Sequence, residues 1–229
     1  MVVITGQVPL SLIGKDSFQE VDIAGITIPI TKHNFFVSRV EDIAGCIREA
    51  FNIARSGRPG PVLVDVPKDL MVKLYEYTPE TPAPPAEPPE LFTEADINAL
   101  AESINKAERP LIYAGGGVIT AKASDKLVKL AEKADIPVVS TLMNLGAIPR
   151  DHKLSLGMVG MHGSKEANQA VYNSDLLIAI GARFSDRVTG DVNSFAKNAK
   201  IVQIDIDNSE IDKNVLVDSA LVGDINVIL

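Results

Sequence analysis

The chain has 229 residues, 46% of them hydrophobic, which is enough to bury a core in one large domain or two modest ones. Its formal net charge of −8, with no basic run, argues against nucleic acid or an anionic membrane as a partner, and no apolar run is long enough to span a bilayer. A single cysteine and three widely spaced histidines predict neither a disulfide nor a metal site.

Two strands and a helix are predicted in the front part of the chain. The apolar run 2–5 predicts a buried strand, and the run 62–66, ended by Pro67, predicts a second that is covered on both faces. Between them, Ser38 and Glu41 have the spacing of a capping box that starts a helix. The face that this helix is expected to bury consists of Ile43, Ile47, Phe51 and Ala54.

A proline-rich run divides the chain. Six of the eleven residues from Pro79 to Pro89 are proline, so this run can form neither a helix nor a central strand and predicts an extended connector. The predicted segments are therefore a front domain, 1–76, a linker, 77–92, and a back domain, 93–229.

The back domain alternates helices and strands. Apolar spacing predicts helices at 97–104, 127–134 and 165–172, and apolar runs predict strands at 111–114, 137–140, 176–180, 201–206 and 221–222. This alternation, with short connections, predicts a doubly wound α/β domain built on a parallel sheet.

The sequence patterns at both ends of the chain predict that it is a piece of a longer protein. A strand is expected directly after Met1, and the apolar helical pattern of 224–229 stops within about two turns. Because an exposed apolar cluster promotes association, a native domain seldom ends in one. A frayed natural terminus is the alternative.

Ligands of a doubly wound sheet bind beyond the carboxyl ends of its strands, so the loops after the strands carry the candidate sites. The triplet 115–117 allows close approach of a bulky or phosphorylated ligand, although a tight turn without a ligand explains it equally well. Because Thr120 stands at the third glycine position of the dinucleotide fingerprint, an ordinary NAD site is disfavoured.

Two further loops carry polar or flexible side chains. Arg183, Asp186 and Arg187 lie in a glycine-bounded loop where arginine could bind a phosphate or carboxylate, or could form a solvated ion pair. The loop 157–163, with two methionines and His162, suits a flavin ring or a substrate, or is a core loop. The polar clusters 16–20 and 67–69 of the front domain read as solvated loops on physical grounds alone.

Six sequence strings, in the same order along the chain, resemble the catalytic subunit of acetolactate synthase, a thiamine-diphosphate and FAD enzyme. The strings that carry the resemblance are ITGQVP (4–9), DSFQE (16–20), TKHN (31–34), GRPGPVLVDVPKD (57–69), GMHG (160–163) and FSDRVTG (184–190). The first domain then resembles the C-terminal part of a pyrimidine-binding domain, and the back domain a central, Rossmann-like FAD-binding domain.

The resemblance also implies residue roles. Gln19 would contact thiamine, Phe18 would pack on the substrate methyl group, and Arg187 would face the carboxylate of the second 2-keto acid. The implied catalytic and channel residues are Phe18, Gln19, Lys68, Met161 and Arg187, with Lys32 near the channel mouth. The implied cofactor contacts are Gln19, Arg58, Gly116, Thr141, Leu142, Val159, Gly160, Met161, His162, Gly181, Ala182, Arg183, Phe184, Ser185, Asp205, Ile206, Asp224 and Ile225.

The sequence departs from the family pattern in several places. Ser17 stands where alanine is common and Ser185 where a second aspartate is common. The strings 190–192 and 223–225 do not match the family's Gly-Asp-Gly…Asn motif for Mg²⁺ and diphosphate, and the catalytic glutamate is not matched either. No metal ligand is therefore predicted in this chain, and the Mg²⁺ ligands are expected outside it.

The implied function is the condensation of pyruvate with a second 2-keto acid, pyruvate or 2-ketobutyrate, with loss of CO₂, in branched-chain amino-acid biosynthesis. The resemblance implies a cytoplasmic homodimer or larger assembly with a possible regulatory small subunit, and the isolated chain is expected to be inactive. The alternatives are a piece of pyruvate oxidase, glyoxylate carboligase or oxalyl-CoA decarboxylase, or a non-catalytic nucleotide-binding module that uses the back domain alone.

Overall fold

The computed structural model describes residues 1–81, 84 and 90–229. The chain forms two compact units, Met1–Glu87 and Pro88–Leu229, called here the front and back units. Much of the predicted linker, 82–83 and 85–89, lies outside the described residues. Its first residues stay with the front unit, where Arg48 donates a hydrogen bond to the hydroxyl of Tyr77 (3.1 Å) and pairs with Glu80 (2.5 Å).

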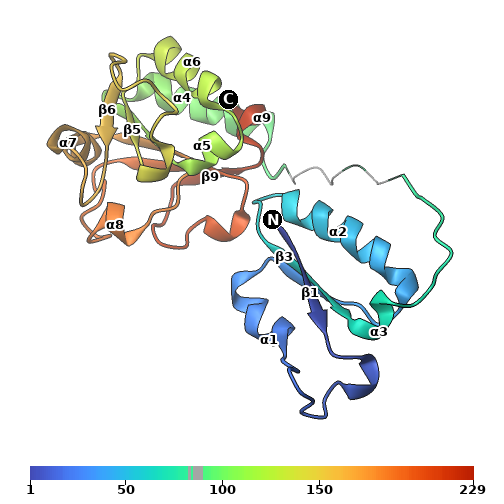
Figure 1. Cartoon of the computed structure of the whole chain (residues 1–229). Helices are drawn as coiled ribbons and strands as arrows, with labels where there is room; N and C mark the ends of the chain where they lie inside the picture. Colours follow the sequence, from blue (N-terminus) through green and yellow to red (C-terminus); the bar gives the residue numbers. More distant parts are fainter. Residues whose placement is uncertain (82–83, 85–89) are drawn as a thin grey trace. The chain divides into compact units, whose positions relative to one another are not determined.

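The front unit contains a three-stranded parallel sheet in the order β1-β3-β2 (Figure 1). Its strands are β1 (Val2–Gln7), β2 (His33–Phe36) and β3 (Val62–Pro67). Its helices are α1 (Ile23–Thr27), α2 (Ile43–Arg55) and α3 (Lys68–Met71), with short 3-10 turns η1 (Leu10–Leu12), η2 (Ile28–Ile30) and η3 (Val40–Asp42).

The predicted strands β1 and β3 form, but only β3 is buried. All six residues of β3 are buried because neighbours flank the strand on both sides. Within the described residues β1 pairs with β3 alone, and Ile4 is 57% exposed. The prediction that 2–5 is a buried strand was therefore wrong, since an apolar run does not reveal whether a strand is central or at an edge.

The start and the buried face of α2 differ from the prediction. Ser38 does not cap the helix, because η3 precedes α2 and the N-cap residue makes no side-chain hydrogen bond. Ala54 of the predicted face is buried and Ile43 packs against the same cluster, but Ala50 lies at the centre of the face and Phe51 is 50% exposed. Two apolar stripes fit the helical period, and the one with small residues allows the closer approach to β3.

The back unit contains a six-stranded parallel sheet in the order β6-β5-β4-β7-β8-β9. The strands are β4 (Pro110–Ala114), β5 (Val138–Ser140), β6 (Ser155–Met158), β7 (Leu176–Ile180), β8 (Lys200–Asp205) and β9 (Ser219–Val222). The helices are α4 (Glu94–Lys106), α5 (Gly116–Thr120), α6 (Ser124–Ala134), α7 (Lys165–Asn173), α8 (Asp186–Thr189) and α9 (Ile225–Ile228), with 3-10 turns η4 (Leu142–Asn144) and η5 (Asn208–Glu210).

Helices cover both faces of this sheet, as Figure 1 shows for α4 and α6 on one side and α8 on the other. Alternate residues of β4 point into separate clusters, because successive side chains of a strand face opposite ways. Ile112 joins the cluster that includes α4 and α6, and Leu111 and Tyr113 join the cluster that includes α7. The predicted doubly wound α/β architecture with a parallel sheet is confirmed.

One strand of the sheet was not predicted. Residues 155–158 form β6, whereas Gly157 and Met158 were expected in a loop. The strand is four residues long, contains a glycine with φ of 84°, and pairs with β5 across a register shift. Its strand conformation comes from pairing with a neighbour, a tertiary contact that local periodicity does not encode.

Candidate functional site

The strand order of the back unit reverses between β4 and β7. The chain runs outward from β4 through β5 and β6, then returns to the other side of β4 and continues through β7, β8 and β9. All five pairings are parallel, so the six post-strand loops meet at one edge of the sheet. A doubly wound fold binds its ligands in the crevice at such a reversal.

The glycine triplet makes a close contact between the two loops at the reversal. The amide of Gly117 donates to the carbonyl of Gly181 (3.0 Å). A β-carbon at Gly115 would lie 2.3 Å from the Gly181 oxygen, and one at Gly117 would lie 2.7 Å from the Gly181 Cα. The close approach that Gly115 and Gly117 permit is thus to the neighbouring loop, and the prediction of a ligand contact in this triplet concerns Gly116.

A buried tyrosine holds the loop after β7. The hydroxyl of Tyr113 donates to the carbonyl of Arg183 (3.2 Å), and burial raises the pKa of Tyr113, so the hydroxyl stays protonated as a donor. The Phe184 ring stacks on Tyr113 with centroids 5.7 Å apart. Between the buried Ala182 and Phe184, Arg183 is exposed at the edge where a ligand would bind.

The loop after β6 is joined to the loop after β7 through the backbone. Met161 donates its amide to the carbonyl of Arg187 (2.9 Å). A β-carbon at Gly160 would lie 2.7 Å from that same carbonyl oxygen, so only glycine permits this approach. The side chains of Met161 and Arg187 are both mostly exposed, and the two predicted channel residues lie side by side although 26 positions separate them.

The residues after β5 include buried polar atoms without hydrogen-bond partners in the described residues and apolar side chains that are exposed to solvent. The oxygen atoms Thr141 Oγ1 and Asn144 Oδ1 are buried and have no hydrogen-bond partner within the described residues. Next to them, Leu142 and Met143 are 68% and 72% exposed. A buried hydroxyl without a partner costs free energy, so this corner has the character of a site that a ligand completes.

Several predicted contacts can offer only backbone atoms to a ligand. The side chains of Val159, Ala182, Phe184 and Ile225 are at most 4% exposed and pack in the two core clusters. The carboxylate of Asp224 accepts from the amide of Asn226 (2.8 Å) as the cap of α9. The remaining predicted residues of the back unit lie in the post-strand loops or at strand ends, namely Gly116, Thr141, Leu142, Gly160, Met161, His162, Gly181, Arg183, Ser185, Asp205 and Ile206.

The predicted residues of the front unit divide between two edges of its sheet. Phe18 and Gln19 lie in the loop after β1, and Lys68 follows β3, which runs parallel to β1. Arg58 and Lys32 precede β3 and β2 and therefore lie at the opposite, amino edge. Lys32 and Lys68, both expected near a channel mouth, are thus not brought together within this unit.

Hydrogen bonds fix the loop that carries Phe18 and Gln19. The side chain of Gln7 donates to the carbonyl of Val21 (2.8 Å), and the amide of Leu10 donates to Asp69 (3.1 Å). Gln19 has φ of 64°, a left-handed conformation that is uncommon outside glycine and concentrates at functional sites. Phe18 is 89% exposed, so its ring is available to contact a ligand or another part of the protein.

Asp205, at the end of β8, carries a buried carboxyl group. Burial raises its pKa above the ordinary value of 3.8, although the amide of Asp207 donates to it (3.0 Å) and favours the charged form. The native state therefore holds this proton at a pH where the unfolded chain has lost it. The contribution of this protonated carboxyl group to the free energy of unfolding is fully present below pH 3.8. It is lost as the pH rises through the raised pKa of Asp205.

The variant Asp205→Asn cannot ionise at this position, so it is expected to avoid the loss of stability that the ionisation of Asp205 causes at higher pH. It should be more stable than the wild type at pH 7, and the difference should shrink toward pH 4, as measured by urea unfolding at both pH values. Asp96→Asn is the matched control, because hydrogen bonds from Thr93 lower the pKa of Asp96 and predict the opposite trend. A constant difference between Asp205→Asn and wild type across this range would contradict the expectation.

Residues 97–229 match the family described as thiamine pyrophosphate enzyme, central domain. This match covers most of the chain and all six strands of the back unit. The chain belongs to the thiamine pyrophosphate enzymes. The family resemblance drawn from the strings of both units is confirmed.

This thiamine pyrophosphate enzyme chain is similar over its whole length to proteins named for acetolactate synthase. It is 50% identical to the probable acetolactate synthase large subunit of Methanocaldococcus jannaschii and 51% identical to the acetolactate synthase of Mycobacterium leprae. Over 93% of the chain it is 48% identical to the acetolactate synthase isozyme 1 large subunit of Escherichia coli K12. The chain spans 40%, 37% and 38% of these relatives, respectively.

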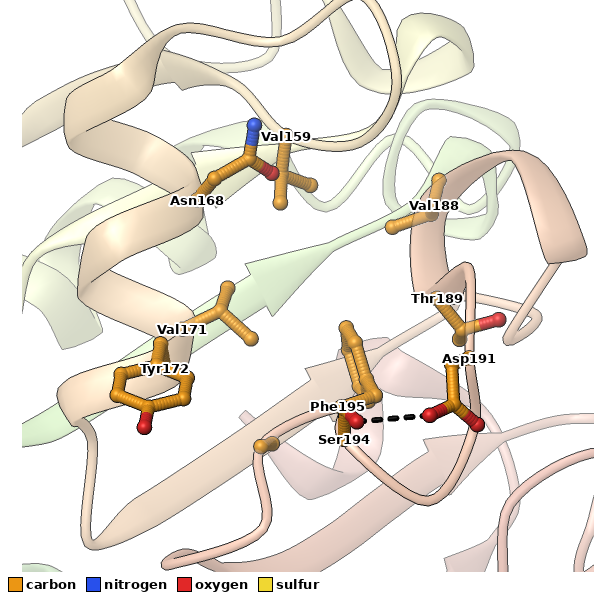
Figure 2. A pocket seen from close by; sticks show the side chains of 10 residues that line it. Val159, Asn168, Val171, Tyr172, Val188, Thr189, Asp191, Ser194 and Phe195 are labelled. Atoms are coloured by element: carbon orange, nitrogen blue, oxygen red, sulfur yellow. Dashed lines mark hydrogen bonds between the residues drawn. The ribbon is translucent and has the colours of Figure 1, made fainter.

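A cavity of about 190 Å³ lies on the α7 side of the sheet. Figure 2 shows Asn168 and Tyr172 of α7 across this cavity from Val188 and Thr189. Its volume is below the range of typical ligand sites, and of the predicted cofactor contacts only Val159 lines it. The cavity is therefore not where the predicted flavin contacts converge.

Two structural absences hold for the described part of the chain. Residues 1–81, 84 and 90–229 contain no group of three or more histidine, cysteine, aspartate or glutamate side chains that could hold a metal ion. Within the same residues, no helix is both long and apolar enough to cross a membrane.

Sequence reasoning missed Asn144 and Asn168. Asn144 is completely buried and donates to Ser140 (3.1 Å), while Asn168 bonds the backbone of Gly160. An asparagine in the interior of a predicted helix is the signal that could have drawn attention to Asn168, because it is a poor helix former that favours bonds to backbone groups.

Proposed function

We propose that this chain is part of an acetolactate synthase catalytic subunit, which condenses pyruvate with a second 2-keto acid, pyruvate or 2-ketobutyrate, and releases CO₂ in branched-chain amino-acid biosynthesis. The observation that carries the proposal is the identity of about one half, across both units, to proteins of that name. The alternative, a nucleotide-binding module made of the back unit alone, would not explain why the front unit is also similar to acetolactate synthases.

The proposed domain assignment follows from the same similarity. Residues 1–76 would be the C-terminal part of a pyrimidine-binding domain, 77–92 a proline-rich linker, and 93–229 the central FAD-binding domain. Thiamine diphosphate would supply the carbanion chemistry, and FAD would be structural. Gln19 would contact thiamine from the front domain.

The residues of the back unit fit a flavin nucleotide. Thr141 Oγ1 is a buried hydroxyl that has no hydrogen-bond partner among the residues described, and the exposed Leu142 and Met143 offer apolar surface to a flat ring. Arg183, exposed between two buried neighbours, would bind the negatively charged phosphates. These residues, with Gly116, the loop 159–162 and Asp205, would hold FAD, and Arg58 would reach it from the front domain.

The protein side chains would bind and orient the second 2-keto acid. The guanidinium of Arg187 would pair with its carboxylate, and Met161, whose backbone amide bonds the carbonyl of Arg187 at this edge, would form an apolar wall. Phe18 would pack on the methyl group of the first pyruvate. An apolar lining beside one cation excludes water and strengthens the ion pair.

The remaining partners belong to the complete protein. Mg²⁺ would be held by groups outside this chain, since the strings 190–192 and 223–225 do not match the family's Gly-Asp-Gly…Asn motif. A cytoplasmic homodimer or larger assembly, with a regulatory small subunit, completes the proposal.

The test is product formation by the complete protein. Pure full-length protein with pyruvate, thiamine diphosphate, Mg²⁺ and FAD should release one CO₂ for each acetolactate formed. The CO₂ is measured before acid is added, and the acetolactate is then measured as acetoin, whose formation in acid releases a second CO₂. The isolated 229-residue chain should form none, because it matches no Mg²⁺–diphosphate motif. Acetate or acetyl phosphate as the product of the full-length protein would refute the proposal.

A further inference from the structure

One side chain of α7 satisfies both backbone polar groups of Gly160. The amide of Gly160 donates to Asn168 Oδ1 (2.9 Å), and Asn168 Nδ2 donates to the carbonyl of Gly160 (3.0 Å). The two bonds also fix which end of the side-chain amide is oxygen. Asn168 therefore acts as a two-point clamp on the loop after β6.

This clamp anchors the point where the loops after β6 and β7 meet. Gly160 has φ of 106° and touches the Arg187 carbonyl so closely that no side chain fits there. The next residue, Met161, donates its amide to the same carbonyl (2.9 Å). A displacement of Gly160 would therefore also displace Met161 and Arg187.

The position of α7 itself does not depend on Asn168. Ala167 and Val171 of this helix are buried in the core, and Ser164 caps its first turn by accepting from the amide of Ala167 (3.0 Å). Asn168 is exposed, and Figure 2 shows it at the end of the cavity beside Val159. The two bonds to Gly160 are part-buried, but they join the helix to the loop and are not among the contacts that hold α7 in the core. Removal of the Asn168 amide should therefore loosen the loop without unfolding the helix.

We propose that Asn168 is a positioning residue that holds Met161 and Arg187 in the arrangement that binds the second 2-keto acid. This inference rests on the proposed function for its kinetic consequence. Its structural part, the clamp on Gly160, is independent of that function. Asn168 itself touches no substrate.

The test uses the full-length protein and four variants. Asn168→Ala removes both bonds, Asn168→Asp is isosteric and removes the donor, Asn168→Gln keeps the amide, and Gln169→Ala alters the exposed neighbour on the same helix. Since a displacement of about 1 Å can cost up to about a hundredfold in rate, the KM for the second 2-keto acid should rise roughly ten- to a hundredfold in the Ala and Asp variants. The kcat at saturation should stay within about twofold, Gln should restore most of the KM, and Gln169→Ala should match the wild type.

A second measurement separates this proposal from the proposed function. Whatever reaction the protein catalyses, hydrogen exchange at the amides of Gly160 and Met161 should be faster in Asn168→Ala than in the wild type. In Asn168→Asp, which keeps the oxygen that accepts from the Gly160 amide, the amide of Met161 should exchange faster. Unchanged exchange, or a fall in kcat with unchanged KM, would overturn the positioning role, and Asn168→Asp decides the matter if Asn168→Ala does not fold. A wild-type protein that exchanges as expected but forms no acetolactate would refute only the proposed function.

Discussion

Gly115→Ala is expected to lower the free energy of unfolding of the back unit by about 3 kcal/mol, at the upper end of overpacking penalties. The new methyl group would lie 2.3 Å from the carbonyl oxygen of Gly181 and 2.4 Å from the Cα of Ala182. Both are backbone atoms at the end of the central strand β7, so no side chain can rotate away. Relief would require β4 and β7 to separate at the reversal of the sheet.

Thermal unfolding of the 229-residue chain measures this effect. A cost of about 3 kcal/mol predicts a melting temperature lower by roughly 10 °C for the back unit. Gly45→Ala is the control, since Gly45 lies inside α2 with no atom within 4 Å of a new β-carbon and alanine should stabilise that helix by about 0.5–1 kcal/mol. An unchanged melting temperature for Gly115→Ala would show that the two loops do not touch as described.

Arg187→Ala in the full-length protein is expected to raise the KM for the second 2-keto acid by about a hundredfold. The reason is the loss of a charge-assisted hydrogen bond pair to a carboxylate, which contributes about 1.5–3 kcal/mol. Arg187→Lys keeps the charge but loses the two-pronged geometry, so its KM should lie between those of the wild type and Arg187→Ala. Steady-state kinetics with 2-ketobutyrate as the varied substrate provide the measurement.

Arg109→Ala is the matched control for charge. Arg109 precedes β4 at the opposite edge of the same sheet, where it donates to the carbonyl of Asn173 (2.8 Å). Its loss changes the net charge equally but should leave the KM within about twofold, because exposed charges at a distance are screened. Equal effects of the two variants would argue for a general electrostatic influence and against a specific contact of Arg187.

The central elements were predictable because local sequence and tertiary environment agree. β7 was predicted with its observed bounds, 176–180, since an unbroken apolar run of five residues is typical of a strand covered on both faces and β7 is such a strand. Peripheral elements were not predictable in this way. β2 and β6 are four-residue edge strands whose conformation depends on one neighbour, and the exposure of β1 depends on what pairs with its outer side.

The candidate site was predictable as a set of loops and unpredictable in its details. Parallel strands place their carboxyl ends together, so this rule selected the loops after β4, β5, β7 and β8. It did not select the loop 157–163, because β6 was not predicted, and only the family resemblance linked Met161 to Arg187. Within the loop after β7 the sequence could not reveal that Phe184 points into the core while Arg183 points outward. Side-chain direction follows from the path of the backbone.

The sequence by itself determined the α/β class, the parallel back sheet and the family, because apolar periodicity and family-specific strings are local properties of the chain. Only the tertiary structure decided that Gly115 and Gly117 pack against the loop after β7, that Thr141 Oγ1 has no hydrogen-bond partner within the described residues, and that Asn168 clamps Gly160. The physical reason is that each of these features is a distance between atoms of different elements, fixed by the packing of the whole unit.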